Sequence, residues 1–255
     1  MFKLGLIGKN LQNSFSKKLF EKKFNKENIN DFNYNLFEMS SIEEFKSLLE
    51  DKNIIGLNVT SPFKEIIINY IDELDEISRI TKSVNTIFIN NKKKIKGYNT
   101  DVYGFEKSLI SLLPKKIKIN ALVLGNGGVS KSICYVLKKR EIDFLIVSRR
   151  RKKIKHVISY EESEKYLQSH KLIINTTILG SKNHINLSPK INYEKLSKEN
   201  YLFDVVYNPT KSLFLNKGSK KGAKIMNGKK MLIAQAEHSF AIWKKNVQLI
   251  KNVKN

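Results

Sequence analysis

Short polar segments in the first 101 residues carry side chains that could bind a small molecule. The hydroxyls of Ser14 and Ser16 follow the first apolar run and suit a ligand with hydroxyl or carboxylate groups, although a helix N-cap before Lys17 explains them equally well. Thr60 and Lys64 follow a second apolar run and lie near the carboxyl end of the strand it predicts, where α/β proteins bind ligands. Pro62 is expected to end that strand and to begin a helix. Both segments are therefore candidates for a polar binding site.

A further segment holds two Asn-Thr pairs in short succession. Asn85-Thr86 comes first, and Asn99-Thr100 is followed directly by Asp101. Side chains of this kind can converge on a polar ligand, but Asn, Thr and Asp are also common turn residues. The residues alone leave both interpretations open.

A glycine turn in the second half has the layout of a dinucleotide-binding unit. The apolar run 119–124 leads into Gly125-Asn126-Gly127-Gly128, and residues 131–139 have a helical pattern. Glycines let the chain turn tightly and let backbone N–H groups approach a pyrophosphate at the helix N-terminus. Such turns also occur at ordinary strand–helix junctions. Here the strand before, the helix after and a second strand over 144–147 together favour nucleotide binding.

The end of that second strand indicates which nucleotide is bound. An NAD site usually places an acid there, roughly 20 residues after the glycines, to bond the ribose 2′-hydroxyl. This chain has Ser148 followed by five basic residues, 149–153, of which the first three are arginines. A guanidinium is a planar fork that suits phosphate oxygens. A solvated charge run explains the lysines, but the arginines at this position favour the 2′-phosphate of NADP.

In order and over nearly the whole chain, these segments resemble the pattern of the shikimate dehydrogenase family. Residues 56–65 are similar to its G-x-N-V-T-x-P-F-K-E motif, and residues 84–104 to V-N-T followed by N-T-D-x-x-G. Further matches are to G-x-G-G, N-R-T, I-N-(A/T)-T-x-x-G, D-x-x-Y-x-P and N-G-x-x-M-L-x-x-Q-A, at 125–128, 148–149, 174–180, 204–209 and 227–236. The resemblance implies an NADPH-dependent enzyme that reversibly reduces 3-dehydroshikimate to shikimate, in chorismate and aromatic amino acid biosynthesis.

The resemblance also implies roles for individual residues. Lys64 is expected to be the catalytic acid/base and Asp101 its close partner. The shikimate hydroxyls and carboxylate are expected to bind Ser14, Ser16, Thr60, Asn85, Asp101, Tyr207 and Gln235. The adenosine phosphates of NADP are expected to bind Gly125, Asn126, Gly127, Gly128, Val129, Ser148, Arg149, Arg150 and Lys153, and the residues expected near the cofactor are Glu76, Val205 and Gly228.

The chain departs from the family's pattern at a few positions. Asn10 and Asn13 stand where the first motif has a proline and a histidine. Asn126 replaces an alanine of the glycine turn, Ser148 replaces an asparagine, and Lys229 replaces an apolar residue. None of these changes removes a proposed catalytic group.

The elements that must position these groups alternate between strands and helices, which predicts an α/β fold. With the resemblance, we expect two domains: an N-terminal α/β substrate domain and a Rossmann-like NADP-binding domain with a parallel sheet. The expected boundaries are 1–101 plus 229–255 for the substrate domain and 102–228 for the NADP domain. Apolar residues at helical spacing over 231–252 predict a terminal helix that packs back onto the first domain.

The net charge of +23 could indicate a nucleic-acid or anionic-membrane binder. Basic residues occur in every third of the chain, however, without the glycine-aromatic signature of RNA-binding modules. A Lys-, Asn- and Ile-rich composition of the kind an AT-rich genome encodes is the simpler explanation. The alternatives that remain are a quinate or aminoshikimate dehydrogenase of the same superfamily, a basic nucleic-acid-binding protein, and a non-catalytic nucleotide-binding relative.

The remaining composition bounds the location and partners. Cys134 is the only cysteine, so we expect no internal disulfide and a reducing cytoplasm. No apolar run approaches the roughly 18 residues that span a bilayer, and the first residues do not read as a signal peptide. The four histidines lack metal-ligand spacing. We therefore expect a small-molecule substrate, no metal, no membrane and no specific nucleic acid, with monomer or homodimer left open.

Overall fold

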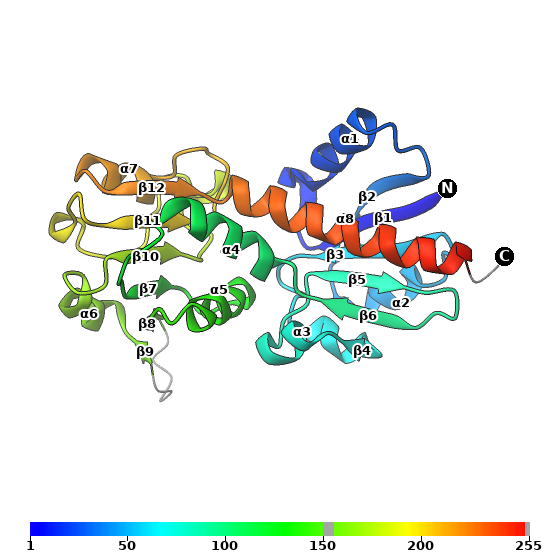
Figure 1. Ribbon diagram of the computed structural model, residues 1–255, viewed down its shortest axis with the longest axis horizontal. Coiled ribbons are helices and arrows are strands. Elements are labelled where there is room, and N and C mark those ends of the chain that lie inside the picture. The colour runs from blue at the N-terminus through cyan, green and yellow to red at the C-terminus, as the bar shows by residue number, and fades with distance from the viewer. Residues whose placement is uncertain (150–155, 253–255) are drawn as a thin grey trace. The chain divides into compact units, whose positions relative to one another are not determined.

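The computed structural model describes residues 1–149 and 156–252, and its elements fall into two compact units (Figure 1). The first unit comprises Met1–Thr100 with Gln235–Asn255, and the second comprises Asp101–Ala234. The first unit therefore takes its residues from both ends of the chain. The boundaries expected from the sequence, after Asp101 and before Lys229, lie a few residues from these limits.

The first unit is built on a mixed six-stranded sheet. In chain order its elements are β1 (Phe2–Gly8), η1 (Leu11–Asn13), α1 (Ser16–Lys26), β2 (Phe32–Glu38), η2 (Ile42–Glu44), α2 (Phe45–Leu48), β3 (Ile54–Val59), η3 (Ile66–Tyr70), β4 (Glu73–Leu74), α3 (Glu76–Thr81), β5 (Thr86–Ile89), β6 (Ile95–Tyr98) and most of α8 (Lys229–Asn252). The strand order is β2-β1-β3-β5-β6-β4. Strands β1, β2 and β3 are parallel, whereas β5 runs antiparallel to β3 and β6.

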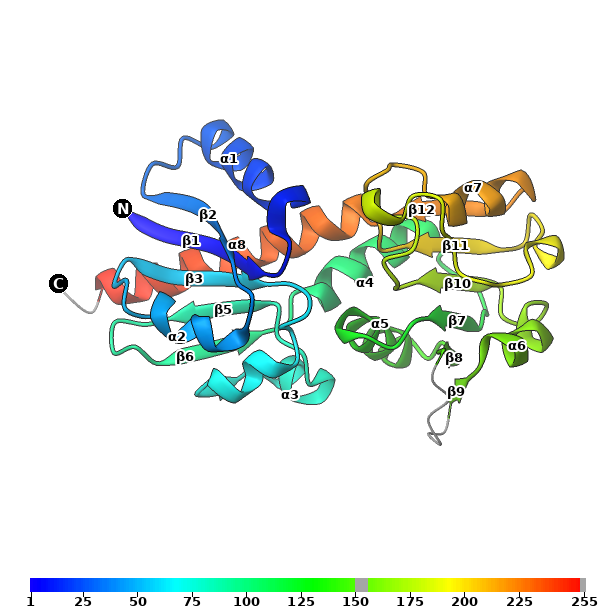
Figure 2. The same cartoon turned by 180° about the vertical axis from the view of Figure 1, so that it is seen from behind.

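Side chains of this sheet alternate between its faces, and each face carries its own apolar cluster. Leu4 and Leu6 of β1 pack on the face covered by α1 and α8, together with Phe20 and Trp243. Ile7 belongs to the cluster on the other face. Helix α8 lies in front of the sheet in Figure 1 and behind it in Figure 2. The predicted terminal helix is thus confirmed, and it packs on the strands that begin the chain.

The second unit has a six-stranded sheet in which every pair of neighbours is parallel. Its elements are α4 (Asp101–Leu112), β7 (Ala121–Leu124), α5 (Gly128–Lys139), β8 (Phe144–Val147), β9 (Val157–Ile158), α6 (Tyr160–Ser163), η4 (Glu164–Tyr166), β10 (Leu172–Asn175), η5 (Lys182–His184), η6 (Tyr193–Lys195), β11 (Tyr201–Asp204), α7 (Leu213–Lys220) and β12 (Lys224–Asn227). The order is β12-β11-β10-β7-β8-β9. A parallel sheet built from strand–helix repeats is the expected Rossmann-like architecture.

The segment after Pro62 differs from its prediction. We expected a helix to begin at the proline, but the chain makes a turn and then the short 3₁₀ helix η3, which is followed by Ile71 in extended backbone. Three consecutive β-branched residues, Ile66 to Ile68, lie in this segment. Their side chains are restricted at χ1, which disfavours a regular α-helix.

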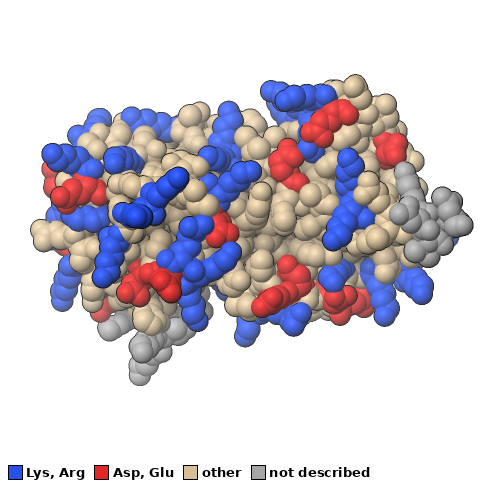
Figure 3. All heavy atoms as spheres, viewed as in Figure 1, with Lys and Arg blue, Asp and Glu red and all other residues tan. Residues whose placement is uncertain are grey.

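The surface is basic without one continuous patch in the view of Figure 3. Lys and Arg side chains are spread over that face, and Asp and Glu side chains lie among them. Some pair across the chain, such as Lys3 with Asp51 at 2.7 Å and Lys171 with Glu199 at 2.9 Å. Exposed pairs of this kind contribute little stability. Within residues 1–149 and 156–252, no helix is long and apolar enough to cross a membrane.

Gly56 of β3 provides a test of the packing between sheet and α8. A Cβ at Gly56 would lie 2.4 Å from Trp243 Nε1, and this ring is fully buried, with Nε1 donating to Ile87 O at 2.8 Å. The ring cannot move aside without losing that bond. We expect Gly56→Ala to lower the free energy of unfolding by about 1–3 kcal/mol. Urea unfolding followed by the fluorescence of Trp243, the single tryptophan, measures it.

The control is Lys18→Ala, on the exposed side of α1, which should change stability by about 0.5 kcal/mol or less. Equal midpoints for Gly56→Ala and the unsubstituted protein would contradict this account of the packing.

Candidate functional site

The carboxyl end of β7 leads into a glycine turn that begins α5. Gly125 has a φ of 112°, a conformation that L side chains rarely adopt, and a Cβ there would lie 2.6 Å from Thr176 Oγ1. A Cβ on Gly127 would meet nothing within 4 Å, so this glycine leaves open space before the helix. Gly128 and Val129 form the start of α5. Unpaired N–H groups at a helix N-terminus attract anions, so the turn is a candidate phosphate site.

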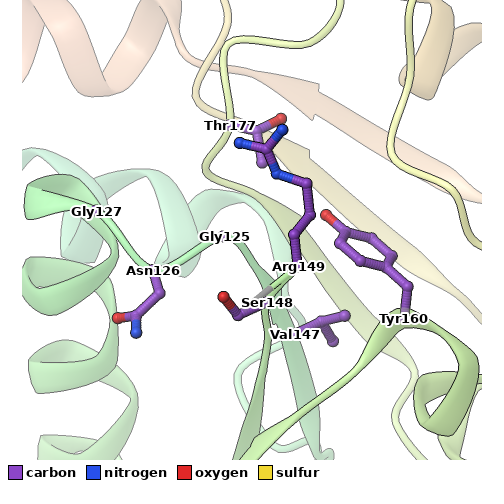
Figure 4. Close-up of a pocket in the computed structure, with 8 residues that line it drawn as sticks. All are labelled: Gly125, Asn126, Gly127, Val147, Ser148, Arg149, Tyr160 and Thr177. Atoms are coloured by element: carbon purple, nitrogen blue, oxygen red, sulfur yellow. The ribbon is translucent and has the colours of Figure 1, made fainter. Parts of the chain in front are cut away.

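This turn borders a pocket of about 620 Å³ (Figure 4). Opposite the turn, the Arg149 side chain extends from the end of β8 toward Thr177, with the Tyr160 ring beside it. Burial raises the pKa of the Tyr160 phenol, and the positive charge of Arg149 opposes that rise. The Arg149 guanidinium therefore lies close enough to Tyr160 to affect its phenol electrostatically, on a side of the pocket that is partly shielded from water. The lining residues are Gly125, Asn126, Gly127, Val147, Ser148, Arg149, Tyr160 and Thr177.

The chemistry of the pocket fits a nucleotide that carries a phosphate on its ribose. None of the described lining residues is acidic, so the carboxylate that an NAD site would offer to the 2′-hydroxyl is missing from this set. Arg149 supplies a cationic fork instead. The structure therefore brings five of the predicted cofactor residues to one pocket: Gly125, Asn126, Gly127, Ser148 and Arg149.

Other predicted cofactor residues lie elsewhere. Val205 and Gly228 are in contact with each other, because a Cβ on Gly228 would lie 2.2 Å from Val205 O. Arg150 and Lys153 lie outside the described residues. Glu76 is exposed at the start of α3, in the first unit.

A buried hydrogen-bond network in the first unit brings together two predicted substrate residues. Asn85 Oδ1 accepts from Thr100 N at 2.7 Å, and Asn85 Nδ2 donates to Gln235 Oε1 at 3.3 Å. Ser239 Oγ lies 2.8 Å from Thr86 Oγ1 and 3.0 Å from Thr100 Oγ1. Hydrogen bonds among residues of β5, the turn after β6 and α8 thus hold the side-chain amides of Asn85 and Gln235 in place.

Backbone bonds hold Thr60 and Lys64 beside the Asn85 segment. Val59 N donates to Asn85 O at 2.8 Å, and Val84 N donates to Lys64 O at 2.8 Å. The chain after β3 and the chain before β5 are therefore joined on both sides of Thr60. This pairing places three predicted residues, Thr60, Lys64 and Asn85, in one region of the first unit.

The two predicted serines lie at the start of α1, Ser16 as its first residue and Ser14 just before it. Ser14 Oγ accepts from Ser16 N at 3.2 Å, within the turn before the helix. The alternative, a serine N-cap before Lys17, is not what the structure has, because Phe15 is the N-cap and no side chain caps the helix. Ser16 itself is buried. Burial raises the pKa of the Tyr34 phenol, and a hydrogen bond with Ser16 opposes the rise. Tyr34 Oη donates to Asn58 Oδ1 at 2.9 Å, which links Ser16 to the polar interior of the sheet.

The remaining predicted residues belong to the second unit. Asp101 is the first residue of α4, follows Thr100 directly and is buried. Tyr207 is half-buried after β11. Among the residues that the structure describes, no group of three or more His, Cys, Asp or Glu side chains could hold a metal ion.

Sequence reasoning assigned no role to several residues of these sites, although Asn58 and Thr177 lie in the matched segments 56–65 and 174–180. Tyr160 and Thr177 line the pocket, and Tyr34, Asn58 and Ser239 support the buried network. A signal existed for two of them. Asn58 is the polar residue of an otherwise apolar buried strand, and Ser239 lies on the buried side of α8. A buried polar side chain needs a partner, so each position pointed to a network.

Comparison with known proteins finds relatives along nearly the whole chain. Residues 6–87 match the shikimate dehydrogenase substrate binding domain. A shikimate dehydrogenase (NADP(+)) from Pelagibacter ubique is 39% identical over 249 residues, covering 95% of this chain and 93% of that protein. The crystal structure of shikimate dehydrogenase from Aquifex aeolicus is 33% identical, with a TM-score of 0.86 and coverage of 95% and 92%. A shikimate dehydrogenase in complex with NADP+ is 29% identical, with a TM-score of 0.81 and coverage of 95% and 90%.

Gly127 provides a test of the pocket that separates binding from folding. Its φ of −105° suits alanine, and a Cβ there would point into open space, so Gly127→Ala should unfold like the unsubstituted protein. A nucleotide in the pocket would meet the added methyl, and we expect its dissociation constant to rise by about tenfold. Calorimetric titration with NADP+ measures the affinity, and thermal unfolding provides the control. Unchanged affinity would place the nucleotide elsewhere.

Proposed function

This chain belongs to the shikimate dehydrogenase family, and from that premise we propose that it reversibly reduces 3-dehydroshikimate to shikimate with NADPH. It is an NADP-dependent oxidoreductase that acts on a CH–OH group. The observation that carries the proposal is the full-length similarity to the Pelagibacter ubique enzyme, 39% identical over 95% of this chain. The glycine turn and Arg149, which share one pocket, support it independently.

We assign substrate binding to the first unit and NADP binding to the second. The match of residues 6–87 to a substrate binding domain supports the first assignment. The parallel sheet, the glycine turn before α5 and the pocket at Arg149 support the second. We assign the substrate hydroxyl and carboxylate contacts to Ser14, Ser16, Thr60, Asn85, Asp101, Tyr207 and Gln235.

The proposed chemistry needs one proton at the reacting oxygen. When bound, NADPH supplies the hydride for the ring ketone. Lys64 gives a proton to the oxygen that becomes an alkoxide, and its ammonium stabilises the negative charge as that charge develops. Asp101 orients Lys64 and accepts a hydrogen bond from the hydroxyl. Thr100 precedes Asp101, and its N–H and hydroxyl are fixed by hydrogen bonds in the buried network. The backbone of Asp101 is therefore attached to a residue that is held in place.

Preorganisation of Asn85 supports its role in recognition. Its side chain is 3% exposed, and its oxygen accepts hydrogen bonds from Thr100 N and Thr86 Oγ1. An amide that is already held in place loses little conformational freedom when a ligand binds.

We place the enzyme in the cytoplasm. Cys134 is the only cysteine, so the fold requires no oxidising compartment. Burial raises the pKa of its thiol to about 12, which suppresses the reactive thiolate at neutral pH.

Cofactor preference tests the role of Arg149. We expect Arg149→Ala to raise the Michaelis constant for NADP by roughly 10- to 150-fold, because a bidentate guanidinium–phosphate contact is lost, and to leave that for NAD nearly unchanged. Arg140→Ala removes the same charge at the other end of α5 and should have little effect. Initial rates with shikimate and each cofactor measure it. Equal activity of the unsubstituted protein with NAD and NADP would defeat the argument.

The catalytic pair tests the reaction itself. The purified protein should form NADPH with shikimate, and more slowly with quinate. Lys64→Ala should lower turnover by about 10²- to 10⁴-fold, with a smaller change in the Michaelis constant for shikimate. Asp101→Ala should impair both. The double variant should be little worse than the more severe single one, because the two residues act as a unit.

Lys52→Ala, an exposed lysine of the first unit, is the matched control and should retain full turnover. Near-normal turnover of Lys64→Ala would show that the proton comes from another group.

A further inference from the structure

Asp204 is a buried carboxylate at the carboxyl end of β11. It is 0% exposed, and its Oδ1 accepts from Asn175 Nδ2 at 3.0 Å and from Val206 N at 2.9 Å. Its Oδ2 accepts a short hydrogen bond from Ser212 Oγ. These partners are neutral, and within the described part of the chain no cation pairs with Asp204. An acid buried in this way is costly, so its geometry needs an explanation.

A relay of hydrogen bonds connects Asp204 to the wall of the nucleotide pocket. Asn175 Oδ1 accepts from Thr177 N at 3.0 Å and from Thr177 Oγ1 at 2.7 Å. Leu179 N donates in turn to Thr177 Oγ1 at 3.2 Å. Thr177 lines the pocket, and Figure 4 shows the Arg149 side chain extending toward it.

The donor and acceptor directions of these bonds indicate that Asp204 helps to orient the side-chain amide of Asn175. An asparagine amide can be turned either way, and the turn exchanges its donor and its acceptor. Asp204 Oδ1 offers only an acceptor, so Asn175 must point its NH₂ group at Asp204 and its oxygen at Thr177. Leu179 O, at 3.2 Å, is a second acceptor for this NH₂ group, so Asp204 supplies one of the two bonds that hold it. Without Asp204 the amide keeps one bond at Nδ2, and its oxygen is held less firmly against the two donors of Thr177.

The protonation state of Asp204 does not alter this task. Burial raises the pKa of the carboxyl to about 7, against the opposing effect of its hydrogen bonds from Ser212, Val206 and Asn175. The neighbouring titratable group is the Tyr193 phenol, whose pKa is raised by its own burial and, to a lesser degree, by Asp204. In the protonated acid, Oδ1 still accepts from Asn175, and a proton on Oδ2 can be donated to Ser212 Oγ. An asparagine at 204 reproduces that arrangement.

We propose that Asp204 is a positioning residue for the nucleotide pocket, which it orders through Asn175 and Thr177. The inference rests on the proposed binding of NADP. It adds a determinant of affinity that does not itself line the pocket.

Dissociation constants for NADP+, measured by calorimetry for a set of variants, test the relay. Asp204→Ala should bind about tenfold more weakly, because Asn175 loses one of the two bonds that hold its NH₂ group, whereas Asp204→Asn should stay within about threefold. Thr177→Val keeps the shape of the side chain and removes the hydroxyl. In the Thr177→Val background, Asp204→Ala should weaken binding by clearly less than it does in the unsubstituted protein, because one of the two bonds between residue 177 and Asn175 is already absent.

Asp143→Ala removes an exposed acid before β8 and is the control for loss of a carboxylate. Thermal unfolding is recorded for every variant. If Asp204→Ala does not fold, Asn175→Ala takes its place in the same cycle. Wild-type affinity in Asp204→Ala, or an equal loss in the Thr177→Val background, overturns the relay. Failure of the unsubstituted protein to bind NADP+ refutes the proposed function instead.

Discussion

The hydroxyl of Ser239 joins the last helix to the strands of the first unit, and the arrangement of the candidate substrate residues depends on that junction. It accepts from Asn58 Nδ2 at 3.0 Å, lies within 3.0 Å of Thr86 and Thr100, and donates to Gln235 O at 2.9 Å. All of these side chains except Gln235 are buried, so water cannot replace a lost partner. Each unsatisfied group would cost about 1–3 kcal/mol, which makes the set rigid as a whole.

The second unit meets the same constraint with a carboxylate in place of a hydroxyl. Asp204 ties β11 to β10 through Asn175 and holds the chain beyond β11 through Val206 and Ser212. In the second unit the polar cluster lies at the carboxyl ends of parallel strands, the edge where α/β sheets bind ligands. In the first unit it lies at the carboxyl ends of β3 and β6 and at the amino end of the antiparallel β5. Side chains that contact a ligand there must be held in one orientation, and hydrogen bonds from a buried polar cluster hold them. Each candidate site therefore includes buried polar residues that support the lining side chains without lining the site themselves.

Local sequence patterns predicted the helices and strands well, but they could not predict contacts between residues far apart in the chain. The strand over 144–147, the glycine turn and the terminal helix follow from periodicity and from glycine chemistry, which act over a few residues. Ser239 escaped because its partner Asn58 lies 181 positions away, and no short window contains both. Thr177 escaped for a related reason. Its place in the pocket depends on β10 being next to β7, which only the sheet order reveals. The prediction of a helix after Pro62 was wrong for a local reason, because three consecutive isoleucines disfavour a regular α-helix there.

The net charge of the chain and its choice of cofactor are separate properties, although both are electrostatic. The charge of +23 is distributed over many exposed side chains, and salt screens such a field within about 8–10 Å at physiological ionic strength. Arg149 lines the pocket together with Tyr160, whose phenol is partly desolvated by burial. An interaction there is screened far less than one at the open surface. Arg149 is the single cation among the described lining residues, so we expect selectivity for a ribose phosphate to depend on it far more than on the surface lysines.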